Sequence, residues 1–246
     1  LETHSTLFSG EQSNSSVAYG EDSLMKVFRK ITPGVNPDIS VHDVLTRTGS
    51  EHIAALYGWL DWVDGDPTSE AQEGNETTVQ LAMLQQFLRT ASDGWELALA
   101  SARNLFAEGD LHAYEAGGDF AAEAERLGVA LREVHELLAE QFPVTRLDAA
   151  AVGKLADAMD ARLDEAVQVV PELAEHVEAL RAAYRRLRAL RGVAVQRIHG
   201  DLHLGQTLRT SLGWKIVDFE GEPAKPLTER LRPDSPCVSQ PPARAR

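Results

Sequence analysis

The chain changes its pattern of apolar residues once, near residue 88, and this change restricts the folds that are open to it. Before residue 88, short apolar runs such as the one from Leu24 to Phe28 alternate with polar or glycine-containing turns, which is typical of an antiparallel meander. After residue 88, apolar residues recur three and four positions apart, which is typical of helices with one buried face. The sequence therefore predicts an α+β protein with a small, mainly antiparallel β lobe (residues 1–87) and a larger helical lobe (residues 88–236).

The elements of the β lobe follow from its apolar runs and its turn residues. Strands are predicted over residues 6–9, 16–19, 24–28, 53–63 and 78–87, with a polar turn over residues 64–75. A helix is predicted from Pro37 to about Leu45, because Asn36 is a good capping residue, proline suits the first helical position, and Asp38 is an acid in the first turn. The β lobe thus contains five strands and one helix.

The helical lobe begins with a capping signature. Asp93 is followed three residues later by Glu96, which predicts a helix running to about Ala107. Further amphipathic helices are predicted over residues 124–138, 155–163 and 173–187, and a strand over residues 193–195. In the first of these helices the residues expected on one buried face are Ala124, Leu127, Leu131, Val134 and Leu138. In these helices the acidic clusters are expected on solvated outer faces. They include Glu123, Glu125 and Glu133.

Composition disfavours two classes of partner and indicates the cellular compartment. The chain has 246 residues, and its 38 acidic and 24 basic residues give a formal charge of −14, which disfavours nucleic acid and anionic membranes as partners. Its one cysteine, Cys237, forms no internal disulfide, and the sequence has no long apolar span or secretory signal. A cytoplasmic protein is therefore expected.

The candidate chemistry lies in two short stretches near the end of the chain. The first reads H-G-D-L-H-L-G-Q over residues 199–206, and the second reads D-F-E-G-E-P over residues 218–223. The spacing from Asp201 to Gln206 is similar to that in the catalytic loop of protein kinases, where an aspartate receives the acceptor proton and an amide oxygen five residues later holds Mg²⁺. Asp218 follows a short apolar run, in the place of the second metal-binding aspartate of kinases.

Together these stretches closely resemble those of actinobacterial maltokinases, in the aminoglycoside-phosphotransferase-like branch of the protein-kinase superfamily. The resemblance is carried by residues 199–210, 217–226 and 232–236, and also by residues 10–16, 87–96 and 105–108. It implies a two-lobed, protein-kinase-like fold that uses ATP and Mg²⁺ to phosphorylate maltose at its anomeric hydroxyl. The product, maltose 1-phosphate, serves α-glucan (glycogen) synthesis, and some relatives are fused to a trehalose synthase.

The same resemblance implies roles for individual residues. Asp201 is the catalytic residue that accepts or orients the proton of the sugar hydroxyl, Gln206 and Asp218 hold the metal, and Lys26 contacts the α and β phosphates. The phosphates are covered by Ser13, Asn14 and Ser15, and the adenine is bordered by Gln86, Phe87 and Leu88. His203 contacts the sugar or stabilises its loop. Glu220 contacts the sugar, assists the metal or is a solvated turn residue. His199 is expected to brace the catalytic loop.

Three other functional interpretations stay open. Glucosamine kinases share the H-G-D-x-H-L-G-Q pattern, so the sugar is not determined by it. His199, Asp201 and His203 would also suit a metallohydrolase. The third interpretation is an inactive nucleotide-binding fragment, because the resembling proteins begin with an extra cap and continue beyond Pro236 with helices, whereas residues 237–246 are expected to be a disordered tail or a frame-shifted end.

One departure from the family concerns the partner of Lys26. The predicted helix after residue 36 should supply a glutamate to this lysine, but Ser40 stands where relatives carry the acid, with Asp38 and Asp43 nearby. A poorly oriented lysine is therefore expected.

Overall fold

The computed structural model describes residues 4–8, 14–64, 77–107, 109, 112, 115, 120–222 and 230–231. The chain divides into two compact units, of which the first comprises Leu1–Gln141 with His199–Arg232, and the second comprises Phe142–Ile198 with Pro233–Arg246. The predicted lobe boundary between residues 87 and 88 lies inside the first unit, and it stays a prediction. The predicted tail over residues 237–246 lies outside the described residues.

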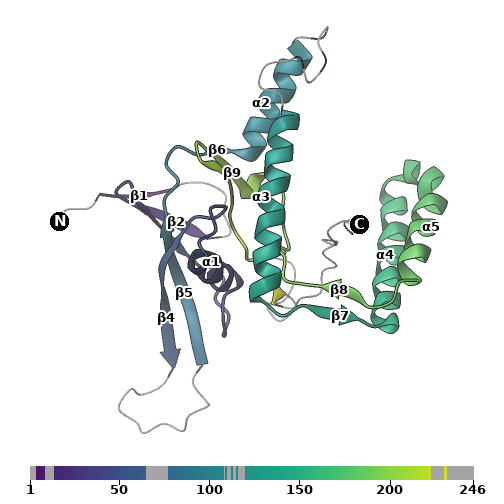
Figure 1. The fold of residues 1–246 in the computed structure, drawn as a ribbon, viewed down its shortest axis with the longest axis horizontal. Helices are drawn as coiled ribbons and strands as arrows, with labels where there is room; N and C mark the ends of the chain where they lie inside the picture. The colour runs from purple at the N-terminus through teal and green to yellow at the C-terminus, as the bar shows by residue number, and fades with distance from the viewer. Residues whose placement is uncertain are drawn as a thin grey trace, which may run out of the picture. The chain divides into compact units, whose positions relative to one another are not determined.

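The first unit contains a five-stranded antiparallel sheet, which confirms the predicted fold class (Figure 1). Its strands are β1 (Ser5–Leu7), β2 (Ser15–Tyr19), β3 (Ser23–Val27), β4 (Leu56–Asp64) and β5 (Thr77–Gln86). They are ordered β1-β2-β3-β5-β4, so β3 lies inside the sheet between β2 and β5. All five strands lie within a few residues of their predicted positions. Most of the predicted polar turn, residues 65–76, lies outside the described residues.

Helix α1 (Pro37–Arg47) begins where its capping residues predict. The side chain of Asn36 accepts a hydrogen bond from the backbone N–H of Asp38, and the backbone N–H of Asn36 donates to Gln80 Oε1 on β5 at 2.6 Å. Ile39 on α1 packs in a buried apolar cluster with Met83 on β5 and with Phe28, which follows β3. The cap and the cluster together fix the first turn of α1 against the sheet.

A second, three-stranded sheet and two helices complete the described part of the first unit. Helices α2 (Gly94–Ala107) and α3 (Phe120–Gln141) agree with the predicted helices, while the strand order is β10-β9-β6. The strands are β6 (Ser92–Asp93), β9 (Thr207–Thr210) and β10 (Gly213–Ile216), and the short 3₁₀ helix η2 (Leu204–Gln206) precedes β9. β6 has only two residues, too few to produce a recognisable pattern in the sequence.

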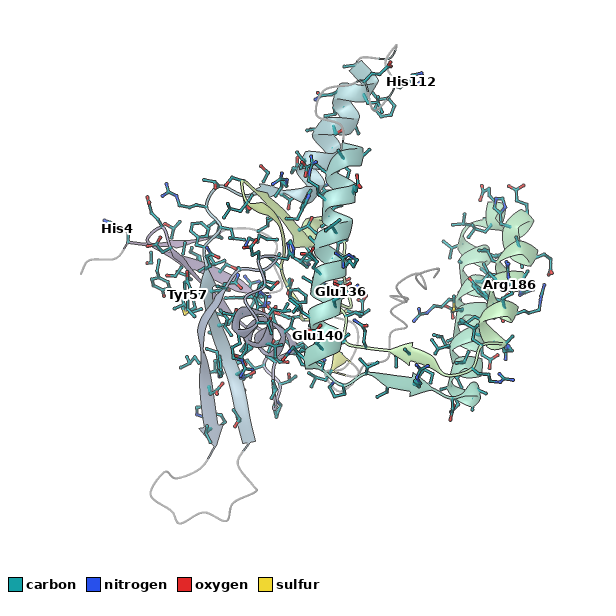
Figure 2. All side chains as sticks on the ribbon, viewed as in Figure 1. His4, Tyr57, His112, Glu136, Glu140 and Arg186 are labelled. Atoms are coloured by element: carbon teal, nitrogen blue, oxygen red, sulfur yellow. The ribbon has the colours of Figure 1, made fainter. Side chains whose placement is uncertain are left out.

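Helix α3 buries a different set of positions from the predicted one at its beginning. Val134 and Leu138 are buried as predicted, and the exposed Glu136 and Glu140 lie on this helix in Figure 2. Ala124, however, is exposed, so its predicted burial is wrong. Periodicity gives the direction of a helix face but not how far along the helix its neighbours extend.

Glu123 corrects the prediction of solvated acidic faces. The Glu123 side chain is 18% exposed, and its carboxylate accepts hydrogen bonds from Arg209 Nε at 2.7 Å and from Trp214 Nε1 at 3.0 Å. Glu133 is half-exposed and lies 2.7 Å from Nε2 of His52. The prediction was wrong for Glu123, because its partners come from a distant segment of the chain, whereas Glu125 is exposed as expected.

The second unit consists of a two-stranded antiparallel ribbon and a helical hairpin. Strands β7 (Thr145–Leu147) and β8 (Val193–Val195) pair with each other, and β8 coincides with the predicted strand. Helices α4 (Ala149–Val169) and α5 (Val177–Arg188) lie side by side, with the 3₁₀ helix η1 (Pro171–His176) between them in the chain (Figure 1). Ion pairs such as Arg181 with Asp164 at 2.5 Å join the two helices.

No helix among the described residues is both long and apolar enough to cross a membrane.

Candidate functional site

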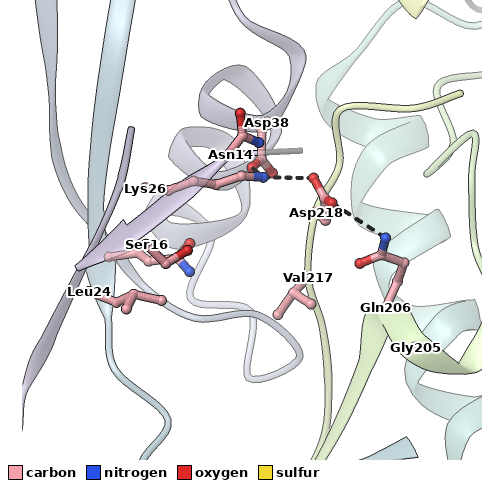
Figure 3. Close-up of a pocket in the computed structure, with 10 residues that line it drawn as sticks. Asn14, Ser16, Leu24, Lys26, Asp38, Gly205, Gln206, Val217 and Asp218 are labelled. Atoms are coloured by element: carbon pink, nitrogen blue, oxygen red, sulfur yellow. Dashed lines mark hydrogen bonds and ion pairs between the residues drawn. The ribbon is translucent and has the colours of Figure 1, made fainter. Parts of the chain in front are cut away.

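Lys26 is the centre of a cluster of three carboxylates that come from two parts of the sequence, helix α1 and the loop after β10. Its Nζ atom lies 2.8 Å from Asp38 Oδ2, 2.7 Å from Asp218 Oδ1 and 2.9 Å from Glu220 Oε1. In Figure 3 the lysine side chain reaches from β3 towards α1 and towards the loop that carries Asp218. The expectation of a poorly oriented lysine is wrong, because Asp38 acts as its partner in α1.

Position on the helix explains why Asp38 is the partner of Lys26. Ser40 is two residues further along α1, and two residues rotate a side chain by about 200° around a helix. Asp43, the other acid considered, is paired with Arg47 at 2.6 Å instead. The sequence places all three residues on one short helix, but only the packing of α1 shows which one faces β3.

Asp38 also binds directly to residues 217–223 (the metal loop), the segment that carries the predicted metal ligand Asp218. Its side chain is 1% exposed, its Oδ1 accepts a hydrogen bond from the backbone N–H of Phe219 at 2.8 Å, and the same oxygen lies 3.0 Å from Nδ1 of His42. Burial alone would raise the pKa of Asp38, but the Lys26 ammonium and His42 lower it well below its usual value. Asp38 is therefore ionised and connects the lysine, the helix and the loop.

The pKa of Lys26 responds to the same cluster in the opposite direction. Burial alone would lower it, but the carboxylates of Asp38, Asp218 and Glu220 raise it above its ordinary value. The lysine is therefore a permanent cation at neutral pH. A compact ammonium of this kind is suited to contact phosphate oxygens.

Gln206 and Asp218 lie next to each other, as their proposed role requires. Gln206 Nε2 donates to Asp218 Oδ2 at 3.3 Å, and the backbone N–H of Val217 donates to the Gln206 carbonyl at 3.0 Å (Figure 3). The β9–β10 hairpin brings the two residues together, since it lies between them in the sequence. Asp218 has φ +66°, a left-handed conformation that is uncommon outside glycine and often found at functional sites.

The donor groups here fit a Mg²⁺ ion. Carboxylate oxygens of Asp38, Asp218 and Glu220 lie within 4.8 Å of one another, and one ammonium group faces the three carboxylates. The resulting excess of negative charge would be offset by a divalent cation, and oxygen ligands suit Mg²⁺. Asp38 already has three polar partners, so Asp218, Glu220 and the amide oxygen of Gln206 are the better ligands.

His199 connects residues 199–206 (the catalytic loop) to the metal loop. Its Nδ1 accepts a hydrogen bond from the backbone N–H of Asp201 at 3.3 Å, so its Nε2 carries the proton that is donated to the Val217 carbonyl at 2.9 Å. Burial lowers the pKa of His199, which favours this neutral form. Because backbone groups engage both ring nitrogens, His199 braces the loop as expected and is not available as a ligand for the alternative metallohydrolase.

Glycines allow the two loops to approach each other closely. Gly200 has φ +86°, and a Cβ atom at this position would lie 3.2 Å from the Cα of Gly221. The H-G-D pattern therefore contains glycine for a structural reason.

Asp201, which follows Gly200, is partly buried and does not line the cavity beside Lys26. Its catalytic role stays a prediction.

A cavity of about 360 Å³ lies beside Lys26. Its polar side includes Asn14, Ser16, Gln206 and Asp218, and Leu24 and Val217 provide apolar surface (Figure 3). Sequence reasoning missed Ser16, Leu24 and Val217. Residues two apart on a strand share a face, so Leu24 could have been found from Lys26 on β3, whereas Ser16 depends on the pairing of β2 with β3, and Val217 follows the end of β10.

The residues predicted to border the adenine lie beside this cavity wall rather than on it. Gln85 lines the cavity, whereas Gln86, Phe87 and Leu88 do not. Phe87 packs edge to face against Phe8, with ring centroids 5.7 Å apart. Neighbouring residues on a strand point to opposite faces, so a shift of one residue exchanges the side chain that faces the cavity.

The residues predicted to cover the phosphates differ in their contacts. Asn14 Nδ2 donates to Glu220 Oε1 at 2.5 Å, which connects the turn before β2 to the metal loop. Ser15 Oγ accepts a hydrogen bond from Arg29 Nε at 3.0 Å, and Ser13 lies outside the described residues.

His203, which was predicted to contact the sugar or to stabilise its loop, is exposed. Its Nδ1 accepts a hydrogen bond from the backbone N–H of Gly205 at 3.1 Å, so it stabilises its own loop.

Comparison with known proteins identifies similar sequences and similar folds. The model of the APH family, described as a phosphotransferase enzyme family, matches residues 17–221. A glucosamine kinase of Streptacidiphilus jiangxiensis is 32% identical over 231 residues, covering 89% of this chain and 48% of the relative. One of Mycolicibacterium smegmatis is 27% identical over 226 residues, covering 91% of this chain and 53% of the relative. The chain thus spans about half the length of these relatives.

Solved structures of glucosamine kinases have a fold similar to that of this chain. A glucosamine kinase crystal structure matches with a TM-score of 0.70 and 27% identity, over 93% of this chain and 54% of that chain. A glucosamine kinase in complex with glucosamine, ADP and inorganic phosphate matches with a TM-score of 0.69 and 28% identity, over 93% of this chain and 55% of that chain.

Proposed function

Because the chain belongs to the phosphotransferase enzyme family, we propose that it transfers the γ-phosphoryl group of ATP to a sugar hydroxyl. The observation that carries this proposal is the position of Lys26 between Asp38 and Asp218, with Gln206 beside Asp218 in the same cavity. A cation for phosphate and oxygen ligands for Mg²⁺ are the main groups that phosphoryl transfer requires of a protein.

We propose an amino sugar, glucosamine, as the acceptor. The support is that both curated relatives are named glucosamine kinase, and that one similar solved structure contains glucosamine, ADP and inorganic phosphate. The matches reported above give no support to maltose, which the sequence resemblance implied. Glucosamine therefore becomes the first acceptor to test and maltose the second.

In the proposed reaction, each residue of the cluster has a defined task. Bound Mg²⁺ would be held by Asp218, Glu220 and Gln206 and would offset the charge of the phosphates. Lys26 binds phosphate oxygens, and Asp38 holds the lysine in place. The oxygen of the sugar hydroxyl bonds to the γ-phosphorus, the bond from that phosphorus to the β-bridging oxygen breaks, and the hydroxyl proton passes to the Asp201 carboxylate. The products are a sugar phosphate and ADP.

The proposal is tested by supplying the chain with Mg²⁺-ATP and a panel that includes glucosamine, glucose and maltose. Phosphorylated sugar and ADP should form in equal amounts, with glucosamine giving the highest kcat/KM. The Asp201→Asn variant should lose at least about a hundredfold in kcat while it binds ATP normally, since it retains the phosphate-binding groups. The Asp43→Asn variant is the matched control, because Asp43 is paired with Arg47 and lies outside the cluster.

Two results would contradict the proposal. Turnover retained by Asp201→Asn would remove the role of this residue as proton acceptor. Binding of Mg²⁺-ATP without transfer to any sugar would support the alternative of an inactive nucleotide-binding fragment.

A further inference from the structure

A second cavity, of about 820 Å³, lies beside the catalytic loop. It is lined by Asp93, Trp95 and Glu96 from the start of α2 and by His203, Leu204 and Gly205 from the catalytic loop. Gly205 also lines the cavity that contains Lys26. The two cavities therefore meet at the loop on which phosphoryl transfer is proposed to occur.

Trp95 presents a large aromatic surface to this second cavity. Its side chain is 54% exposed, although a tryptophan of a folded protein is highly buried on average. The flat, apolar face of an indole ring suits the C–H face of a sugar ring, and binding pockets commonly combine aromatic walls with a few polar groups.

The local structure holds Trp95 in a fixed position relative to the catalytic loop. Asp93 Oδ1 accepts hydrogen bonds from the backbone N–H groups of Trp95 and Glu96 at 2.8 and 3.0 Å. Gly94 packs so closely against this loop that an added Cβ would lie 2.1 Å from Thr207 Oγ1 and 2.8 Å from the Leu204 carbonyl oxygen. The tryptophan backbone is thus fixed on the frame that also positions Gln206.

Two of the residues that line this cavity, His203 and Glu96, carry polar side-chain groups. Nδ1 of His203 accepts a backbone hydrogen bond, so in the neutral ring Nε2 carries a proton that is available to a ligand oxygen. The Glu96 carboxylate makes no hydrogen bond or ion pair with any described residue, whereas Asp93 is used as the helix cap. An aromatic wall with one N–H donor and one carboxylate matches a sugar that carries hydroxyl groups and an ammonium group.

We infer that this cavity is the acceptor-sugar subsite, in which Trp95 stacks on the sugar ring and Glu96 pairs with the amino group of glucosamine. The inference rests on the proposed function. Its geometry is suitable, because His203 follows Asp201 by two residues, so their Cα atoms are at most about 7 Å apart. Trp95 and Glu96 are then the residues that determine the choice of sugar.

The test compares Trp95→Ala with Trp95→Phe in steady-state kinetics, with glucosamine and ATP varied in turn. The alanine variant should raise the KM for glucosamine at least about tenfold, since it removes the aromatic surface. The phenylalanine variant should restore most of the affinity, and the KM for ATP should not change in either. Trp62→Ala is the matched control, because Trp62 is 51% exposed on β4, away from both cavities.

Glu96→Gln tests the amino-sugar part of the inference. This variant should lower the ratio of kcat/KM for glucosamine to that for glucose about two- to fivefold, the range expected for one solvent-exposed ion pair. An unchanged ratio would remove Glu96 from the recognition of the amino group.

Failure of this inference is distinguishable from failure of the proposed function. An unchanged KM for glucosamine in Trp95→Ala, or a raised KM for ATP instead, would overturn the inference but not the proposed sugar phosphorylation. A raised KM for ATP would indicate that Trp95 contacts the ribose of the nucleotide and not the acceptor sugar. If the chain phosphorylates no sugar, calorimetric titration with glucosamine in the presence of ADP still tests whether this cavity binds the sugar. Binding by the wild type that Trp95→Ala loses would support the subsite, and equal or no binding would overturn it.

Discussion

At the scale of single residues, Asp38 contacts more parts of the site than its position in the sequence indicates. It forms an ion pair with Lys26, accepts a hydrogen bond from the Phe219 backbone and contacts His42, all while almost completely buried. A buried charge is tolerated when it is paired and hydrogen-bonded, as this one is. Its position therefore depends on Lys26 as much as the position of Lys26 depends on it.

The Asp38→Asn variant should lower kcat/KM for ATP by about ten- to a hundredfold and lower the melting temperature. The reason is that an amide cannot neutralise the buried lysine, and breaking a buried ion pair costs about 3–5 kcal/mol. Kinetics and differential scanning calorimetry measure the two effects. The Asp43→Asn variant makes the same chemical change on the same helix at a partly exposed pair, and it should behave as wild type. Equal effects of the two variants would refute the role given to Asp38.

At the scale of elements, the site depends on how the beginning of α2 and the β9–β10 hairpin contact their neighbours. Gly94 allows α2 to contact the segment around Thr207, and Glu123 on α3 binds Arg209 and Trp214 of the hairpin. Because Asp218 follows this hairpin, both contacts help to set the positions of the metal-loop residues.

The Gly94→Ala variant should reduce the free energy of unfolding by about 1–3 kcal/mol, because a methyl group there overlaps Thr207 and the Leu204 carbonyl. Urea unfolding measures this change. Gly128→Ala on α3 is the matched control. A Cβ there has no neighbour within 4 Å among the described residues, so alanine should be neutral or stabilising by up to about 1 kcal/mol. A Gly94→Ala protein as stable as the wild type would show that the contact can relax.

The contacts of Glu123 predict a dependence of stability on pH. Hydrogen bonds from Arg126 and Arg209 outweigh the opposing effect of burial and lower the pKa of Glu123 from 4.5 to about 2. Because the folded state binds this proton more weakly than the unfolded state, the stabilisation is complete above about pH 4.5 and is lost as the pH falls towards 2.

We expect Glu123→Gln to cost about 1 kcal/mol of unfolding free energy at pH 7, and less at pH 3. Urea titrations of both proteins at the two pH values give this difference. Glu125→Gln, at an exposed neighbouring position, should have no comparable effect. A Glu123→Gln deficit that is the same at both pH values would show that the charge of Glu123 does not stabilise the fold.

At the scale of the whole molecule, the cluster joins segments that are up to 194 residues apart, since Lys26 and Glu220 meet in it. Ligands that bind between such segments stabilise the folded chain against unfolding, because the unfolded chain has no such site. Mg²⁺-ATP at about a hundred times its Kd should therefore add about 2.7 kcal/mol and raise the melting temperature by about 5–10 °C.

Thermal-shift measurements with ATP, in the presence of Mg²⁺ or of a chelator, check this expectation. The increase should be larger with Mg²⁺, and Asp218→Asn should lose most of the Mg²⁺-dependent part because one of its proposed ligands is removed. Asp43→Asn again serves as the control. An increase that is equal with and without the metal would contradict the assignment of Asp218.

The sequence by itself determined the elements of the fold and the residues with the strongest chemistry. Local signals located α1 through Asn36 and Pro37 and the start of α2 through Asp93 and Glu96, because capping depends on residues within one turn. The H-G-D-L-H-L-G-Q and D-F-E-G-E-P stretches pointed to Gln206 and Asp218, which the hairpin between them brings together.

Only the tertiary structure decided which residues meet across long separations. It selected Asp38 over Ser40 and Asp43 as the partner of Lys26, and Gln85 over Gln86 at the cavity wall. It also gave Glu123 a partner, Arg209, from a distant hairpin. The physical reason is that helix rotation and strand alternation turn a shift of one or two residues into a different direction of the side chain. Which direction faces the site is determined by packing between segments that are distant in the sequence, and no local pattern contains that information.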